Sequence, residues 1–439
     1  MTEHSYGMGD AFAALREGQP DLATEICQQV LDSDPENASA WFLQGILHAQ
    51  AGRTDDALPN FERAVQFKPE SPTYQYNLGL VRSSLRKHDE AIQAYRDAIK
   101  LQPEMLEAQN NLGNCLVMLE KSQEAADHFR EVARDFPQEA IVHFNLANVL
   151  EDIGEYKECI EAYEKAIELD PNFDSARDNL GRTYAGITEY DEALRVWKEW
   201  LEHDPENPIP RHMIAGITGE MVPDRCDDDY VLNTFDDTFA SSYEKQLSRI
   251  GYSVPVLVQD AIDSVQLEKS NRLNVLDAGC GTGLCSSVLR PYAQTLVGVD
   301  LSPDMLRLAE QTGRYDDLIE GELTQVLCEL TLEFDLIVFG DTLCYFGDLT
   351  QVLAAVRQRI SSSGMTIFTV ENLALQHEEE QADLSVDYRL LPNGRYQHNE
   401  EYIEASIQAA GLTLLSITKA KLRMERGREV EGLVVVAKS

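Results

Sequence analysis

A glycine-rich loop is the first group of residues whose types and spacing point to chemistry. In the stretch NVLDAGCGTGLCSSVL an apolar segment ends at Asp277, and glycine then occupies alternate positions: Gly279, Gly281 and Gly283. Glycine at the turn from a strand to a helix lets the backbone approach a ligand closely. Asp300 ends the next apolar segment, where a carboxylate can accept hydrogen bonds from both hydroxyls of a ribose. These features predict a site for an adenosine-containing cofactor.

The spacing of these glycines distinguishes between adenosine cofactors. The loop reads GxGxG, whereas the loop that binds the pyrophosphate of a dinucleotide in dehydrogenases reads GxGxxG. The spacing therefore favours a cofactor other than a dinucleotide.

Alternating strands and helices are predicted to position this loop. A strand at 273–278 precedes it, and a strand at 295–300 leads into a helix that begins after Ser302, a good N-cap residue. Further helices are expected at 231–247 and 254–265, and further strands at 317–323, 334–341, 364–371, 412–420 and 432–439. This alternation predicts a doubly wound, Rossmann-like α/β sheet, mostly parallel, with its ligand beyond the carboxyl ends of the strands.

The first half of the chain is an internal repeat of 34 residues. Proline recurs at this spacing, at positions 35, 69, 103, 137, 171 and 205. Small residues occupy positions 23, 57, 91, 125, 159 and 193, and aromatic residues positions 61, 95, 129, 163 and 197. This is the spacing of the tetratricopeptide repeat, in which two antiparallel helices form each unit and the units stack into a superhelix. We expect six repeats at 4–207, forming an all-α superhelix, and a capping helix and linker at 208–229.

One polar position recurs on the first helix of four repeats: Asn77, Asn111, Asn145 and Asn179. This helix is expected to line the concave side of the superhelix. A side-chain amide offers both a donor and an acceptor, so four of them can hold the backbone of an extended peptide. The series resembles the asparagine ladder of O-linked N-acetylglucosamine transferase and predicts a protein or peptide partner. The alternative is that the amides make local hydrogen bonds within the repeats.

The C-terminal half resembles a known enzyme family at three places. The segments VLDAGCGTG, VGVDLSPDML and FDLIVFGDTLCYFGDL are similar to those of class I S-adenosylmethionine-dependent methyltransferases, and the likeness extends over residues 230–439. The whole chain resembles a family of methyltransferases with N-terminal tetratricopeptide repeats. This resemblance implies S-adenosylmethionine as the cofactor and methyl transfer as the reaction.

The resemblance also implies roles for the matching residues around the methionine portion of the cofactor. This portion would be lined by Asp277, Gly279, Gly281 and Gly283. Tyr243, in the helix expected at 231–247, resembles the lid tyrosine of quinone-type methyltransferases. The alternative for Tyr243 is an aromatic residue of the core.

At the adenosine portion, the resemblance places Asp300 on the ribose hydroxyls and Leu301 against the adenine. Glu322 would accept a hydrogen bond from the adenine amino group, and the backbone amide of Leu323 would follow it. The alternative for Glu322 is a surface acid.

Methyl transfer asks for little acid–base chemistry, because a sulfonium methyl is already activated and the protein has mainly to position and desolvate the reactants. Asp341 and Tyr345 follow the expected fourth strand, and Asp341 would lie where the methionine amino group meets the acceptor. His398 in GRYQHNEEY is a third catalytic candidate, because related chains carry a similar element beside the pocket. The alternative for His398 is a structural or solvated loop residue. We expect no metal site.

Both halves of the chain are acidic. Residues 1–222 carry 41 acidic and 19 basic residues, and residues 223–439 carry 35 and 18. Because binding to nucleic acid or to an anionic membrane needs a basic surface, neither is expected to be the main partner. Eight scattered cysteines without a CxxC pair indicate a reducing compartment, and the N-terminus does not resemble a signal peptide. We therefore expect a cytoplasmic protein.

Three functions are compatible with this sequence. The favoured one is an S-adenosylmethionine-dependent methyltransferase whose repeats recruit a protein, either as the methyl acceptor or as its carrier. The second is a small-molecule methyltransferase whose repeats serve only to place it in a complex. The third is a scaffold that binds the cofactor without transferring its methyl group, and the intact glycine loop and Asp300 argue against it.

Overall fold

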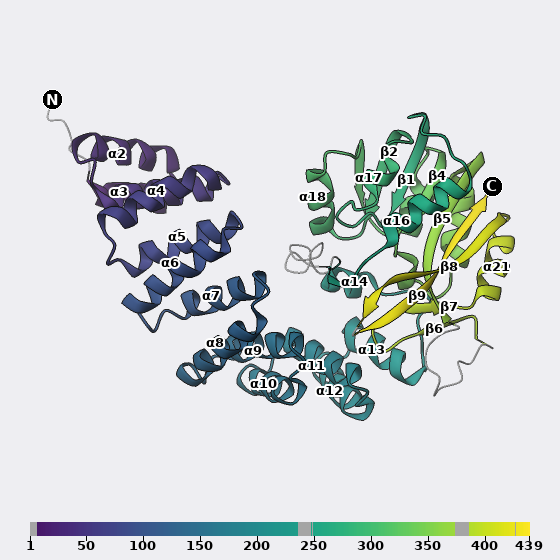
Figure 1. Ribbon diagram of the computed structural model, residues 1–439, viewed down its shortest axis with the longest axis horizontal. Coiled ribbons are helices and arrows are strands. Elements are labelled where there is room, and N and C mark those ends of the chain that lie inside the picture. Colours follow the sequence, from purple (N-terminus) through teal and green to yellow (C-terminus); the bar gives the residue numbers. More distant parts are fainter. Residues whose placement is uncertain (1–6, 236–246, 248, 374–385, 426) are drawn as a thin grey trace. The chain divides into compact units, whose positions relative to one another are not determined.

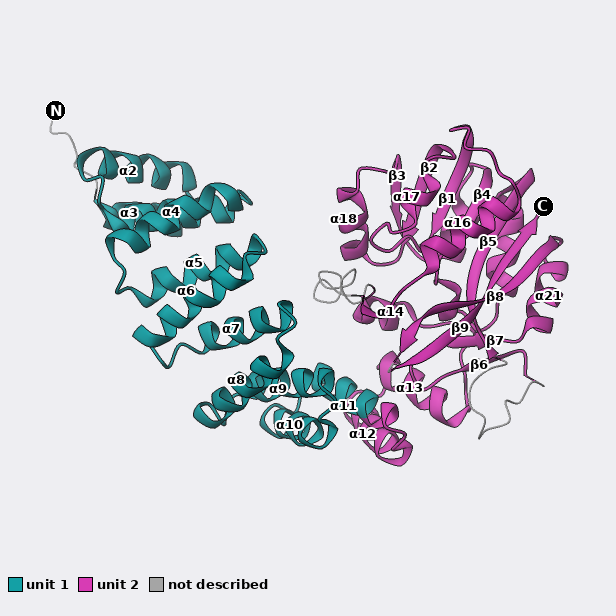
Figure 2. Cartoon of the chain, viewed as in Figure 1, with its two compact units in different colours: residues 1–183 teal, residues 184–439 magenta. Residues whose placement is uncertain are grey.

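The chain divides into two compact units, residues 1–183 and 184–439 (Figure 2). The computed structural model describes residues 7–235, 247, 249–373, 386–425 and 427–439 (Figure 1). The division falls inside helix α11, so that the helices which follow it belong to the second unit. The domain limits expected at 207 and 229 stay predictions.

The first unit consists of paired antiparallel helices, as the repeat predicted. The pairs, continued into the second unit by α12, are α1 (Met8–Arg16) with α2 (Pro20–Ser33), α3 (Ala38–Gln50) with α4 (Thr54–Phe67), α5 (Pro72–Ser84) with α6 (His88–Leu101), α7 (Leu106–Met118) with α8 (Ser122–Asp135), α9 (Ala140–Asp152) with α10 (Tyr156–Leu169) and α11 (Asp174–Gly186) with α12 (Tyr190–His203). Each recurring proline lies two residues beyond the end of a second helix, where its ring cannot obstruct a helical hydrogen bond.

Close approach of the two helices in a repeat explains the recurring aromatic residues. A Cβ atom added to Gly113 would lie 2.3 Å from the ring of Phe129, and one added to Gly79 would lie 2.5 Å from Tyr95. Both aromatic side chains are buried. The ring therefore fills the space that the missing side chain leaves, and the two helices pack through it.

The second unit is built on one sheet, in which nine strands of the described residues are paired in the order β3-β2-β1-β4-β5-β7-β6, with β9 beside β5 and β8 beside β9. The strands are β1 (Leu273–Ala278), β2 (Ala293–Asp300), β3 (Asp317–Glu320), β4 (Phe334–Phe339), β5 (Ile360–Asn372), β6 (Tyr388–Leu390), β7 (Tyr396–His398), β8 (Thr413–Glu425) and β9 (Arg428–Lys438). Pairing is parallel from β3 through β5, and β8 and β9 add an antiparallel hairpin. The expected doubly wound, mostly parallel sheet is confirmed.

Helices cover both faces of this sheet. Apolar side chains of α16 (Val254–Ser264) and α17 (Ser286–Leu289) pack on one face. Those of α19 (Leu323–Glu329), α20 (Thr350–Arg359) and α21 (Glu400–Ala409) pack on the other. α18 (Pro303–Gln311) follows β2 and begins at Ser302, whose hydroxyl accepts the amide of Met305 as the predicted N-cap. Among the helices of the described residues, none is both long enough and apolar enough to cross a membrane.

Two predicted elements differ from those observed. The strand expected at 317–323 ends at Glu320, because Glu322 caps the N-terminus of α19 and turns the chain into a helix. The helix expected at 231–247 starts earlier, since the carboxylate of Asp227 caps the N-terminus of α14 (Asp228–Thr234). The remainder of that prediction, with Tyr243, falls largely outside the described residues.

Residues 208–227, here called the docking segment, are attached to the sheet rather than free between the repeats and the sheet. The segment comprises α13 (Pro208–Thr218) and the turn that follows it. His212 Nε2 lies 2.9 Å from the carbonyl oxygen of Gly394, and Tyr396 donates to the carbonyl of Pro223 at 2.8 Å. The docking segment therefore contributes to the fold of the second unit.

Its far end adds three backbone hydrogen bonds to the turn after β4. The amides of Gly347 and Asp348 both donate to the carbonyl of Asp224, and the amide of Cys226 donates to that of Tyr345, each at 2.8 Å. The segment predicted as a capping helix and linker is thus hydrogen-bonded to the sheet-containing part of the chain.

We predict that a fragment comprising residues 184–439 folds cooperatively, whereas one comprising 230–439 is destabilised. The shorter fragment loses the five hydrogen bonds of the docking segment, which at about 0.5–1.5 kcal/mol each amount to roughly 3–7 kcal/mol. Urea unfolding followed by circular dichroism measures the difference, with the full chain as control. Equal free energies of unfolding for the two fragments would show that the docking segment contributes nothing to the fold.

Candidate functional site

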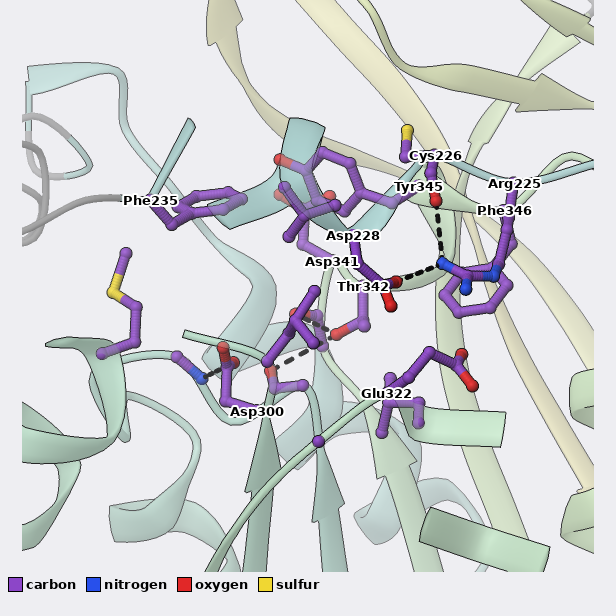
Figure 3. Close-up of a pocket in the computed structure, with 18 residues that line it drawn as sticks. Arg225, Cys226, Asp228, Phe235, Asp300, Glu322, Asp341, Thr342, Tyr345 and Phe346 are labelled. Atoms are coloured by element: carbon purple, nitrogen blue, oxygen red, sulfur yellow. Dashed lines mark hydrogen bonds and ion pairs between the residues drawn. The ribbon is translucent and has the colours of Figure 1, made fainter. Parts of the chain in front are cut away.

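A pocket opens at the carboxyl ends of β1, β2 and β4 (Figure 3). Because parallel strands end at one edge of a sheet, this edge is where an α/β fold gathers its ligand-binding residues. Eight of the residues proposed from the sequence line it: Gly279, Gly281, Asp300, Leu301, Glu322, Leu323, Asp341 and Tyr345.

The glycine loop has a conformation that only glycine adopts without strain. Gly279 and Gly281 have φ angles of 75° and 52°, in the left-handed region. A Cβ atom on Gly279 would lie 2.3 Å from the side chain of Thr342, whereas one on Gly281 would meet open space. The first glycine is needed for packing against the turn after β4, and the second leaves room in the pocket for a ligand.

Asp300 lies at the end of β2 with its carboxylate in the pocket wall. One of its oxygens accepts the amide of Gly281 at 2.8 Å, and the other accepts the amide of Ser302 at 2.9 Å. Burial raises the pKa of this carboxyl, against the effect of these amides. Each carboxylate oxygen has two lone pairs, so both can accept a further hydrogen bond from a ligand.

Glu322 occupies the opposite wall of the pocket. Its Oε2 accepts the amide of Gln325 at 2.8 Å as the N-cap of α19. Its Oε1 is buried and makes no hydrogen bond within the described part of the chain. An acceptor buried without a partner is unfavourable, so this oxygen is suited to a donor supplied by a ligand. Leu301 and Leu323 provide apolar walls on either side.

Asp341 and Tyr345 lie beyond the end of β4. Asp341 has a φ angle of 58°, which is uncommon for a residue with a side chain, and its amide donates to the hydroxyl of Thr369 at 2.8 Å. The Tyr345 ring meets that of Phe235 edge to face, with centroids 5.6 Å apart. A carboxylate and an aromatic wall therefore line the pocket beyond the end of β4 (Figure 3).

Three proposed residues lie outside the pocket lining, and a fourth lies outside the described residues. Asp277 is buried behind the loop, where it accepts the hydroxyl of Tyr315 at 2.7 Å. Gly283 faces the same tyrosine, whose ring would be 3.0 Å from an added Cβ atom. Both residues therefore shape the loop from behind. Tyr243 falls in the range 236–246, outside the described residues.

His398 is the third proposed residue that lies outside the pocket lining, and its surroundings differ from those expected of a catalytic base. Its side chain is fully buried, with Nε2 3.1 Å from the carbonyl oxygen of Gly347 and its ring stacked on that of Tyr402. Burial lowers its pKa to about 4. The imidazole is neutral near pH 7 and holds the turn after β4. These surroundings agree with the alternative given for His398, a structural residue.

The docking segment and α14 supply a wall of the pocket that the sequence did not indicate. Arg225 donates to the carboxylate of Asp228 at 2.6 Å, and Phe235 accepts the Ser302 hydroxyl through its carbonyl at 2.8 Å. The acidic run in this stretch caps a helix, since Asp227 is the N-cap of α14. Because Phe235 and Ser302 are 67 residues apart in the sequence, no local sequence pattern predicts their contact. The lining residues missed are Arg225, Cys226, Asp228, Val231, Phe235, Gly321, Met305, Gly340, Thr342 and Phe346.

Comparison with known families agrees with both halves of the chain. Residues 276–366 match the family described as "Methyltransferase domain", and stretches between residues 11 and 195 match tetratricopeptide repeat families. The chain therefore carries tetratricopeptide repeats followed by a methyltransferase domain. Its repeats are also similar to those in the crystal structure of YrrB, described as a tetratricopeptide protein with an unusual peptide-binding site, at 21% identity and a TM-score of 0.37, covering 43% of this chain and 97% of that one.

Curated relatives match the methyltransferase half. A malonyl-[acyl-carrier protein] O-methyltransferase of Acetivibrio thermocellus is 25% identical, covering 33% of this chain and 53% of the relative. The mitochondrial ubiquinone biosynthesis O-methyltransferase of Saccharomyces cerevisiae is 26% identical, covering 25% and 37%. Methyltransferase-like protein 27 of Homo sapiens is 35% identical, covering 19% and 35%. The chain thus spans about half or less of the length of these relatives.

We predict that Asp277 makes stability depend on pH. Burial raises its pKa from 3.8 to about 7, so the folded state binds a proton that the unfolded state releases between these values. The free energy of unfolding should therefore fall as the pH rises from about 4 to 7. Asp277→Asn removes this contribution and should gain roughly 1–4 kcal/mol relative to the native chain across that window.

Urea unfolding at several pH values provides the measurement. Asp317→Asn, an exposed acid at the start of β3, serves as control and should follow the native profile. A constant difference between Asp277→Asn and the native chain from pH 4 to pH 7 would contradict the prediction.

Proposed function

We propose that this protein is an S-adenosylmethionine-dependent methyltransferase whose repeats recruit a protein, as the methyl acceptor or as its carrier. The observation that carries the cofactor assignment is the Asp300 carboxylate at the end of β2, directed into a pocket beside the open face of Gly281. We place its action in a reducing compartment such as the cytoplasm, since all eight cysteines are free thiols.

The charges of the pocket support this cofactor over a dinucleotide. Its lining carries four acids, Asp228, Asp300, Glu322 and Asp341, and one base, Arg225. S-Adenosylmethionine brings a cationic sulfonium and a cationic ammonium, whereas a pyrophosphate brings two negative charges. In addition, the amide of Gly281 already donates to a carboxylate, although a pyrophosphate loop keeps such amides for the ligand.

Asp300 would hold the ribose hydroxyls, Glu322 the adenine amino group, and Asp341 the amino-acid end of the cofactor. The bound cofactor supplies an activated methyl group, so the protein has mainly to align the acceptor and exclude water. Phe235 and Tyr345 form an aromatic wall suited to excluding water. If the acceptor carries a proton, Asp341 or Tyr345 would receive it, since both line the pocket and His398 does not.

We predict that Asp300→Ala lowers the affinity for S-adenosylmethionine at least tenfold. The loss removes hydrogen bonds to a charged acceptor, at about 1.5–3 kcal/mol each. Calorimetry with the full chain measures it. Asp300→Asn keeps the size of the side chain and should also bind weakly, whereas Glu310→Ala, an exposed acid on α18, should bind as the native chain does. Equal affinity of native and Asp300→Ala chains, or tighter binding of NAD, would overturn the assignment.

The recruitment role is proposed for the concave face of the repeats. The four asparagines are half-buried, and their amide nitrogens donate within the array. Asn111 donates to the Tyr76 hydroxyl at 3.3 Å, Asn145 to the Asn110 amide oxygen at 3.4 Å and Asn179 to that of Asn148 at 3.0 Å. Such hydrogen bonds within the repeats are what the alternative interpretation of the asparagines predicts. A peptide would be held by the amide oxygens, or by exchange of the weaker of these bonds.

We predict that replacing Asn77, Asn111, Asn145 and Asn179 by alanine weakens capture of a basic peptide several-fold, at about 0.5–1.5 kcal/mol per hydrogen bond lost. The acidic repeats favour a basic partner, so capture should also weaken with salt. Fluorescence anisotropy with labelled oligolysine and oligoglutamate measures both effects. The matched control replaces four exposed residues, also 34 apart, on the second helices: Gln66, Lys100, Arg134 and Glu168. Equal affinities of the two quadruple variants would leave the asparagines with a local role only.

A second candidate is a small-molecule O-methyltransferase whose repeats serve in assembly. It is favoured by the names of the relatives, of which the first is an O-methyltransferase for a carrier-bound acid and another acts in ubiquinone biosynthesis. Labelled methyl transferred from S-adenosylmethionine in a lysate separates the two. Label in the protein fraction supports recruitment of an acceptor or carrier, and label confined to small molecules supports the second candidate. Label in neither fraction favours a scaffold that binds without transfer.

A further inference from the structure

Five charged residues form an ion network that reaches the candidate pocket through Asp341, the one member that the proposed chemistry requires. It is here called the buried ion network, because Arg423 and Glu371 at its centre are buried. The network joins Asp341, Glu371, Arg395, Arg423 and Glu425. Arg423 lies at its centre. The side chains of Arg423 and Glu371 are each only 1% exposed, which is rare for ionised groups.

Arg423 contacts three carboxylates through three different nitrogens. Its Nε donates to Glu425 at 2.7 Å, its Nη2 pairs with Glu371, and its Nη1 lies 3.4 Å from both oxygens of Asp341. Arg395 adds contacts to Glu371 and Glu425 at 3.5 and 3.4 Å. A planar guanidinium fixes the directions of such bonds, so the network holds each carboxylate in one orientation.

Stability alone is a weak reason for this arrangement. For many buried ion pairs, the free-energy cost of removing both charges from water exceeds the gain from their attraction. An apolar pair of similar size often stabilises the fold as well as such a pair or better. Burial raises the pKa of Glu371, against the effect of Arg423 and Arg395. The network therefore has a cost, and its one member in the pocket lining is Asp341.

Contacts fix both the backbone and the side chain of Asp341. Its backbone is in the left-handed region, and its amide is bound to Thr369 of β5. Its carboxylate is 10% exposed and bound to Arg423 of β8. Without Arg423, the carboxylate would be free to turn away from the pocket.

We infer that Arg423 is a positioning residue, which through the buried ion network directs the Asp341 carboxylate at the cationic amino-acid end of the cofactor. The inference rests on the proposed function, since it assumes that the pocket binds S-adenosylmethionine. It assigns to the C-terminal hairpin a part in recognising the methionine portion.

The experiment compares three ligands by calorimetry: S-adenosylmethionine, S-adenosylhomocysteine and 5′-methylthioadenosine, which lacks the amino-acid end. The variant Arg423→Met with Glu371→Met removes one charge of each sign, so the net charge is unchanged. The expected result is a loss of at least about fivefold in affinity for the first two ligands, with the affinity for 5′-methylthioadenosine within about twofold of native. A merely structural role would weaken all three together.

Two further variants complete the design. Asp341→Asn should show the same pattern, and combining it with the double variant should add no further loss, because the residues act through one contact. The control is Lys421→Met with Glu429→Met, an exposed ion pair of 3.0 Å on the same hairpin, which should bind all three ligands as the native chain does. Should the double variant fail to fold, Arg423→Lys keeps the charge without reaching three carboxylates and should show the same pattern.

Native affinity for S-adenosylmethionine in Arg423→Lys and in the double variant would overturn the inference, and so would a parallel loss for all three ligands. A native chain that binds neither S-adenosylmethionine nor S-adenosylhomocysteine would instead overturn the proposed function, and this inference with it. The two failures are therefore distinguishable.

Discussion

Parallel pairing of β1 with β2 on one side and with β4 on the other brings the residues of the candidate site to one edge of the sheet. Strands that run in the same direction end together, so Asp300 at the end of β2 and Asp341 after β4 flank the loop that follows β1. The loop must pass between them, and at Gly279 it lies so close to Thr342 that no side chain fits. Gly279 therefore follows from this crowding, whereas Gly281 faces open space in the pocket.

The docking segment extends this edge into a pocket. Its hydrogen bonds to the turn after β4 place Arg225 and Asp228 opposite the glycine loop, and α14 then reaches the start of α18 through Phe235. The candidate site is therefore formed by more than the doubly wound sheet. Residues that precede the recognisable methyltransferase sequence complete its wall.

The charged side chains that line the pocket determine the charge of the ligand that it can bind. Acids predominate among them, and through Asp341 the buried ion network joins two further carboxylates and two guanidinium groups to the lining. A cationic ligand suits such surroundings, because its charge compensates carboxylates that have lost part of their hydration. The same acidity argues against anionic partners, as the composition of the whole chain had indicated.

The sequence by itself determined the elements whose signals are local. The 34-residue spacing predicted the helix pairs. The glycine loop that starts at Gly279, together with Asp300, predicted the first two strands and a ligand site at their carboxyl ends. Tertiary structure decided what depends on residues distant in sequence. It placed His398 in the interior rather than in the pocket, brought Arg423 to Asp341, and attached the docking segment to the sheet. The physical reason is that periodicity reports which face of an element is buried, whereas pairing between elements depends on packing and on the satisfaction of buried charges, which no short stretch of sequence records.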